Sequence, residues 1–64
     1  MAYDARFAVY RSSDGQYYYY IFRAANGEVL VTSETYVRKQ SAFDGIEAFK
    51  RSVAGADIVD MTER

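Results

Sequence analysis

The stretch QYYYYIFR, residues 16–23, decides the fold of this chain. Its residues 17–22 are all aromatic or β-branched, which fits a pleated strand and fits a helix poorly. The stretch lies between SSDG at residues 12–15 and AANG at residues 24–27. Asp-Gly and Asn-Gly are typical of tight turns, because the Asp or Asn bonds the local backbone and Gly accepts a positive φ. The stretch therefore predicts the second strand of an antiparallel meander.

The segments beyond these two turns complete the predicted sheet. Residues 5–11 alternate between apolar and polar side chains and place Phe7 and Val9 on one face. Residues 28–33 are a second apolar run of strand length. Because a short turn joins each strand to the next, we expect both pairings to be antiparallel.

The apolar period changes to that of a helix over residues 39–53. Four residues recur at i, i+4, i+7 and i+11 and share one helical face: Ala42, Ile46, Phe49 and Val53. Gly45 lies beside this stripe at a cost in helix propensity, which indicates that the helix backbone runs close to the sheet. Ser41 and Asp44 have the spacing of a capping box, so they are a candidate N-terminal cap inside this range.

Gly55 is expected to end the helix, and residues 56–62 are a short apolar piece that predicts a fourth strand. The fold class is therefore α+β, with the order β-β-β-α-β in one domain over residues 1–64. One helix covers one face of the meander.

The size of the chain favours assembly. A domain of about 60 residues buries only about 60% of the surface of its unfolded chain, and such domains often need disulfides, metals or oligomerisation. The 64 residues include no Cys and no His, so oligomerisation is the support that is left. Ile58, Val59 and Met61 lie beyond the helix stop with little local core to cover them. We expect these three side chains at a homodimer interface.

The missing residue types also exclude whole classes of chemistry. Without Cys and His there is no thiol nucleophile, no Ser-His-Asp triad and no thiolate or imidazole metal ligand. Carboxylate chemistry needs two acids in one cleft, and no period in the sequence places Glu28 and Glu34 together. Asp57, Asp60 and Glu63 have no EF-hand spacing. We expect no catalytic residue, no metal, no cofactor and no enzymatic activity.

Hydropathy predicts where the protein is located in the cell, and its charge bears on whether it binds nucleic acid. No run approaches the roughly 20 apolar residues of a membrane-spanning helix, and the N-terminal residues show no secretory signal, so a cytoplasmic protein is expected. The net charge is −1 and the pI about 5.2, which counts against nucleic acid as a partner. A local basic patch would still attract it.

The tyrosine run supplies the most unusual candidate site. Alternation along a strand places Tyr18, Tyr20 and Phe22 toward the helix, and it leaves Tyr17, Tyr19 and Ile21 pointing away. The outward rings either cover a sheet face or a dimer contact, or they form a stacking platform for nucleobases or another planar ligand. Three nearby cations keep the second interpretation open: Arg6, Arg11 and Arg23.

Two further candidates lie around the start of the helix. Arg38 and Lys39 either form an anion-binding corner with exposed backbone N–H groups or are a solvated pair on a loop. The segment with Ser33, Glu34 and Tyr36 is either a polar site or a connector whose side chains bond the local backbone.

The order of elements and the residues at the turns resemble one family. The similarity runs from about Arg6 to Lys50, and three groups of residues carry it: FAVY at 7–10 with RAANGE at 23–28, TSE at 32–34 with Tyr36, and Lys39, Ala42, Gly45 and Ile46. The chain thereby resembles the YegP-like family of small bacterial proteins. Two departures are the apolar alternate positions of the second strand and Val37-Arg38 before the helix, where the family usually has small polar residues.

The resemblance implies a β3-α-β unit that pairs with a second unit, shares a continuous sheet with it and exchanges C-terminal strands. With one unit in this chain, the expected assembly is a strand-swapped homodimer. The resemblance implies no enzymatic activity. The leading hypothesis is a non-catalytic homodimeric interaction module whose further partner the sequence does not identify. The alternative is a nucleic-acid or nucleotide-binding protein that uses the aromatic and basic sheet face.

Overall fold

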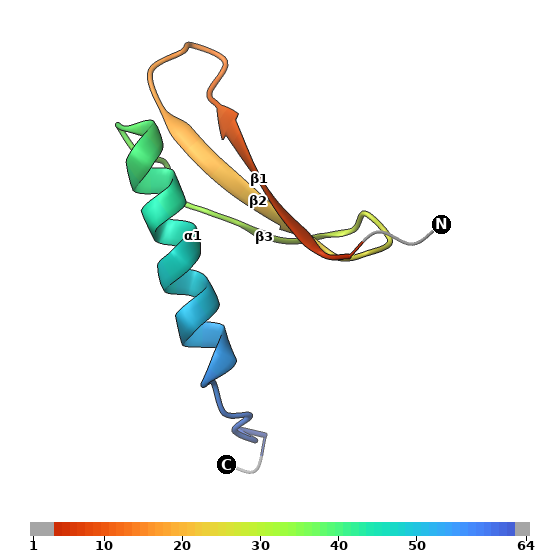
Figure 1. Cartoon of the computed structure of the whole chain (residues 1–64). Helices are drawn as coiled ribbons and strands as arrows, with labels where there is room; N and C mark the ends of the chain where they lie inside the picture. Colours follow the sequence, from red (N-terminus) through yellow and green to blue (C-terminus); the bar gives the residue numbers. More distant parts are fainter. Residues whose placement is uncertain (1–3, 63–64) are drawn as a thin grey trace.

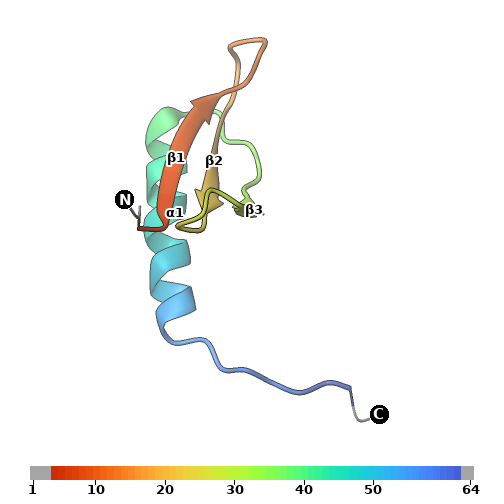
Figure 2. The same cartoon turned by 90° about the vertical axis from the view of Figure 1, so that its right-hand side faces the viewer.

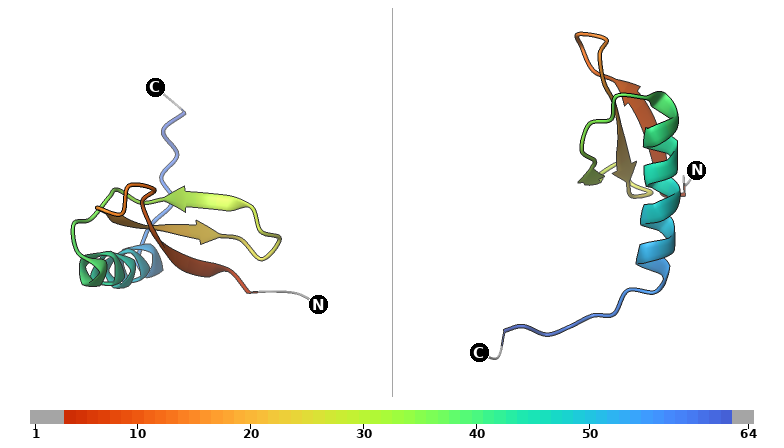
Figure 3. Two further views of the ribbon diagram at one scale, coloured as in Figure 1. Left: turned by 90° about the horizontal axis from the view of Figure 1, so that it is seen from above. Right: turned by 90° about the vertical axis from the view of Figure 1, so that its left-hand side faces the viewer.

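The computed structural model describes residues 4–62 and has an α+β fold. Its elements are three strands and one helix: β1 (Arg6–Arg11), β2 (Tyr18–Arg23), β3 (Val29–Thr32) and α1 (Lys39–Ala54). The strands form one antiparallel sheet in the order β1-β2-β3 (Figure 1). The helix covers one face of the sheet and packs on β2 and β1 (Figure 3). The predicted meander and its helix are thus present.

The loop between β1 and β2 is longer than the sequence predicts, because Gln16 and Tyr17 lie outside β2. The Asp14 carboxylate accepts hydrogen bonds from the Ser12 hydroxyl at 2.6 Å and from the Gln16 amide at 3.0 Å. Gly15 has a φ of 76°, a backbone conformation that favours glycine. These bonds extend the loop by two residues, so that β2 begins at Tyr18.

The core is small and lies between β1, β2 and α1. The rings of Phe7 and Phe22 stack with their centroids 4.4 Å apart, and Phe49 meets them from the helix at 5.8 and 6.1 Å. Only three hydrophobic residues of the described chain are buried: Tyr20, Ala42 and Ile46. Each lies on a face that the apolar period predicts for the core.

Gly45 is the point of close contact between α1 and the connector after β3. A Cβ built on Gly45 would lie 2.5 Å from the hydroxyl oxygen of Tyr36 and 3.0 Å from its Cζ. Tyr36 is held there by two backbone hydrogen bonds with Tyr18, of 2.8 and 2.7 Å. The absence of a side chain at Gly45 therefore makes room for the Tyr36 ring.

The predicted capping box at Ser41 and Asp44 is wrong. Arg38 is the N-cap, with an extended backbone and no hydrogen bond from its side chain, so Ser41 is already inside the first turn. The Ser41 amide bonds the Arg38 carbonyl at 3.1 Å, and Asp44 accepts a hydrogen bond from Gln40 Nε2.

Residues 56–62 form no strand in the single chain. They leave α1 at Gly55 and run away from both the helix and the sheet (Figures 2 and 3). Ile58 is 100% exposed, and Val59 and Met61 are 69% and 62% exposed. The segment that the sequence predicts as a fourth, exchanged strand thus pairs with no strand of residues 4–62.

The C-terminal half of α1 diverges from the sheet (Figure 1). An apolar groove lies between this part of the helix and the strands β1 and β2. Its volume is about 320 Å³. Six residues line it: Phe7, Phe22, Phe49, Lys50, Val53 and Ala54. The aromatic core is therefore open to solvent on this side.

Candidate functional site

The open face of the sheet presents a pair of stacked tyrosines. Tyr10 and Tyr19 are directly paired across β1 and β2, with ring centroids 5.5 Å apart and an angle of 23° between the planes. Tyr17 precedes β2 and is 39% exposed. The rings of Tyr20 and Phe22 lie instead beside Phe49 of the helix. This is the division of the tyrosine run that alternation predicts.

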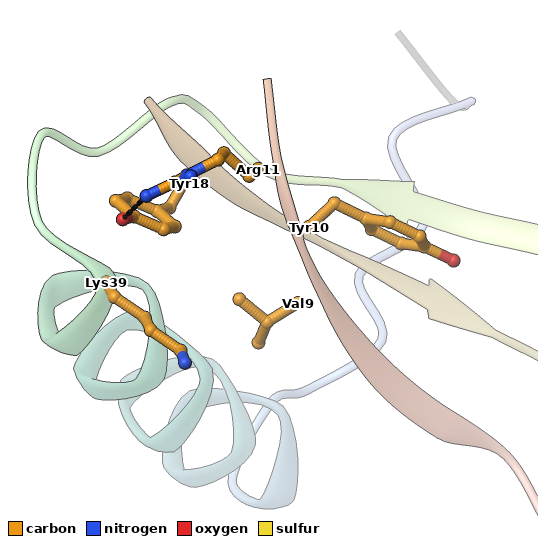
Figure 4. Close-up of a pocket in the computed structure, with 5 residues that line it drawn as sticks. All are labelled: Val9, Tyr10, Arg11, Tyr18 and Lys39. Atoms are coloured by element: carbon orange, nitrogen blue, oxygen red, sulfur yellow. Dashed lines mark hydrogen bonds between the residues drawn. The ribbon is translucent and has the colours of Figure 1, made fainter. Parts of the chain in front are cut away.

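Two of the three cations that the sequence associates with these rings, Arg11 and Arg23, have other contacts. Arg23 Nη1 donates a hydrogen bond to the Gly27 carbonyl at 2.8 Å, which ties its guanidinium to the turn between β2 and β3. Arg11 pairs with Tyr18 in the sheet register and directs its side chain to the helix side (Figure 4). Of the predicted binding residues, only Lys39 lines the recess described next, and Arg38 is the N-cap of α1.

A recess of about 270 Å³ lies between the end of β1, the start of β2 and the first turn of α1. Five residues line it: Val9, Tyr10, Arg11, Tyr18 and Lys39. Figure 4 shows Val9 and Lys39 extending into the space between strand and helix, whereas the ring of Tyr10 points away. We refer to this feature as the Arg11–Lys39 recess.

The Arg11 side chain in the recess is held by Tyr18. Arg11 Nη2 donates a hydrogen bond of 3.0 Å to the Tyr18 hydroxyl, and its Cζ lies 5.5 Å from the centroid of the Tyr18 ring. A cation over an aromatic face is attracted by the ring quadrupole. The Tyr18 backbone is fixed in turn by its two hydrogen bonds with Tyr36. The guanidinium therefore has a supported position although it is exposed.

The recess is electropositive. Arg11 and Lys39 line it, and no carboxylate is among its lining residues. The first turn of α1 contains no acidic residue. Lys39 thus adds a cation at the helix end where the macrodipole already favours negative charge. The chain as a whole carries a net charge of only −1, so this recess is a local feature.

Sequence reasoning missed Arg11 as a member of this site and grouped it with the outward tyrosines. The signal that identifies it is parity along β1. Residues 7, 9 and 11 share one face of a strand, and the sequence already places Phe7 and Val9 together on one face. Arg11 follows them onto the helix side, where Lys39 lies.

Ser33 and Glu34 form a connector and no cleft. The Ser33 amide donates a hydrogen bond to the Tyr20 carbonyl, and the Tyr20 amide donates one to the Ser33 hydroxyl, both at 2.9 Å. The Ser33 hydroxyl donates in turn to the Glu34 carbonyl at 2.7 Å.

Within residues 4–62, no group of three acidic, Cys or His side chains is arranged to hold a metal ion. No helix in the same residues is long and apolar enough to cross a membrane.

The comparisons with known proteins agree on the family. Residues 12–60 match the family described as a domain of unknown function, DUF1508. The chain is 46% identical over 57 residues to the UPF0339 protein Atu0232 of Agrobacterium fabrum, and the match covers 89% of this chain and 90% of that protein. The chain belongs to this family. The YegP-like resemblance of its turns and helix start is thereby confirmed.

Solved structures of similar sequence share the fold. An NMR solution structure of a protein from Haloferax volcanii matches with a TM-score of 0.75 and 33% identity, over 89% of this chain and 95% of that one. The solution NMR structure of ATU0232 from Agrobacterium tumefaciens matches with a TM-score of 0.69 and 45% identity, over 91% and 92%. A longer relative, the UPF0339 protein PA0329 of Pseudomonas aeruginosa, is 42% identical over 48 residues, which are 75% of this chain and 43% of that protein.

Proposed function

We propose that this chain is a non-catalytic interaction module that acts as a homodimer, in which residues 56–62 of each copy add a strand to the sheet of the other. The observation that carries the proposal is the exposure of Ile58, Val59 and Met61 on an extended segment. Burial of each such side chain would contribute roughly 1.5–3 kcal/mol. A second copy would bury these side chains and would provide a strand with which the segment can pair.

The surface of the single chain supports this assembly. Its solvent-accessible area is 5318 Å², whereas a folded monomer of 7.3 kDa is expected to expose about 4200 Å². The excess is about 1100 Å², and each partner in a standard protein interface buries about 800 Å². The unpartnered area is therefore large enough for a stable interface.

Two structural features offer places for the second copy. The groove beside Phe7 and Phe49 is apolar and open, and β1 and β3 are both edge strands of the sheet. Edge strands present unpaired backbone groups that a strand from another chain can pair with. The length of PA0329 also supports pairing, because the match covers less than half of it and leaves room for a second such unit.

Sedimentation equilibrium at low micromolar concentration tests the proposal. The expected mass is close to twice 7.3 kDa. A well-folded monomer under these conditions would contradict it.

The nucleic-acid alternative has no supporting observation, because Arg11 faces the helix and Arg23 is bonded to a turn. The cytoplasmic location remains a prediction of the sequence.

A further inference from the structure

We propose that the Arg11–Lys39 recess binds a small tetrahedral oxyanion of the phosphate class, either free phosphate or a phosphomonoester group. The recess lies at the opposite end of α1 from the exposed apolar segment, because Lys39 begins the helix and the segment follows its last residue, Ala54. Its ligand would be held by side chains from β1, β2 and α1 together.

The first argument is the supply of hydrogen-bond donors. A guanidinium has five N–H groups and an ammonium has three. For Arg11, the structure shows one hydrogen bond, which runs to Tyr18. Lys39 forms no hydrogen bond or ion pair with the described residues. The Tyr18 hydroxyl accepts from Arg11 and keeps its own hydrogen to donate. Several donors therefore line one recess, and no acceptor among residues 4–62 uses them.

The second argument is the absence of competing carboxylates. Asp14, which lies in the neighbouring loop, is bonded to Ser12 and Gln16. Asp44 of the helix is bonded to Gln40. No ion pair joins Arg11 or Lys39 to a carboxylate of residues 4–62. A phosphate carries about two negative charges near neutral pH and would balance both.

The third argument is geometry. The planar fork of Arg suits bidentate contact with phosphate, while Lys acts as a point charge. Stacking on Tyr18 limits the positions of the Arg11 guanidinium, which lowers the entropy lost on binding. The volume of about 270 Å³ equals about nine water molecules at about 30 Å³ each. This room fits a small ion with a short substituent and is below the size of a typical drug-like site.

The test is a titration of the ¹⁵N-labelled protein with sodium phosphate, followed by amide chemical shifts at constant ionic strength. A parallel titration with glycerol phosphate separates the two sources, because only the ester adds an organic substituent. We expect saturable shifts at residues 9–11, 18 and 38–41. Lys39→Gln and Arg11→Gln should each weaken binding at least tenfold. Tyr18→Phe should weaken it less, since the ring that supports Arg11 remains.

The matched control is Arg51→Gln, which removes one positive charge from the last turn of the same helix and should leave the affinity unchanged. Dispersed spectra of each variant establish that it is folded. Shifts that rise linearly without saturation, shifts of equal size with sodium chloride, or equal weakening by Arg51→Gln would overturn the proposal. The dimer is tested by mass alone, so either proposal can fail without the other.

Discussion

Gly45 is a residue at which a single methyl group changes the packing of α1. A Cβ there would approach the Tyr36 hydroxyl within 2.5 Å, and the backbone of Tyr36 is pinned to Tyr18. Overpacking of this kind costs about 1–3 kcal/mol, whereas Ala gains up to about 1 kcal/mol in helix propensity. We therefore expect Gly45→Ala to lower the free energy of unfolding by about 1–2 kcal/mol in urea titrations monitored by circular dichroism.

The control for this variant is Gly55→Ala. It places the same methyl group where nothing lies within 4 Å, at a residue with a φ of −105°. Its stability should stay within about 0.5 kcal/mol of the wild type. Stabilisation by Gly45→Ala would show that the Tyr36 ring moves aside at no cost.

Asp14 makes the loop between β1 and β2 sensitive to acid. Hydrogen bonds from the Ser12 side chain and the Gln16 amide hold the pKa of Asp14 below its ordinary value of 3.8. Because the folded state favours the carboxylate, this contribution to stability is present above pH 3.8 and is lost as the pH falls through the lower folded-state pKa. Asp14→Asn should lower the Tm at pH 7, and the difference from wild type should shrink below pH 3.8.

Glu28→Gln is the comparison for the acid experiment, since Glu28 is exposed and lies in the turn before β3. Its Tm should follow that of the wild type at every pH. A gap between Asp14→Asn and wild type that stays constant from pH 7 to pH 2 would show that the effect does not come from titration of this carboxyl group.

At the scale of elements, the strands and the helix could be predicted because their signals are local. The aromatic run, the two Gly turns and the helical apolar stripe each act over a few residues, and the positive φ of Gly15 and Gly27 agrees with both turns. The first residue of β2 could not be predicted, because hydrogen bonds of the Asp14 side chain extend the loop. The uncapped start of α1 was missed for a related reason: the apolar stripe outweighs the cap.

The candidate site was less accessible to sequence reasoning than the fold. Lys39 was named from its place at the helix start, but its companion Arg11 is 28 positions away in the sequence and was assigned to the other face. The recess exists only because the meander brings the end of β1 beside the first turn of α1. A site of this kind depends on tertiary packing, and the periodicity of a sequence does not show which distant residues pack together.

The C-terminal segment is the element whose removal tests strand exchange most directly. Deletion of residues 56–64 takes away the apolar side chains and leaves a sheet edge unpaired, so we expect a monomer or an aggregate. A triple variant, Ile58→Ser with Val59→Ser and Met61→Ser, should have the same effect while keeping the chain length. Light scattering coupled to size-exclusion chromatography measures the mass of the deletion and of the triple variant.

A matched variant of the same segment keeps its apolar residues. Asp57→Ala with Thr62→Ala changes two polar side chains and should leave the mass of the assembly unchanged. An unchanged mass and Tm in the deletion itself would argue against any role of this segment in assembly.

At the scale of the whole molecule, the single chain is more extended than a compact domain of its length. Its radius of gyration is 14.3 Å, whereas a compact domain of 64 residues is expected to have about 11 Å. Folding coupled to association makes thermal stability depend on concentration. We expect the Tm to rise by several degrees between 2 and 200 μM protein, measured by circular dichroism in cells of different path length. A constant Tm over this range would indicate a monomer that is stable by itself.

The segment after Gly55 also has a consequence for the lifetime of the protein in a cell. An extended, exposed stretch of chain is a preferred substrate for proteases, which require several residues without regular structure. A copy that has found its partner would hide this stretch, whereas a copy in excess would display it. Degradation would then remove the unpaired copies first, and the steady-state amount of protein would be set by pairing as well as by synthesis.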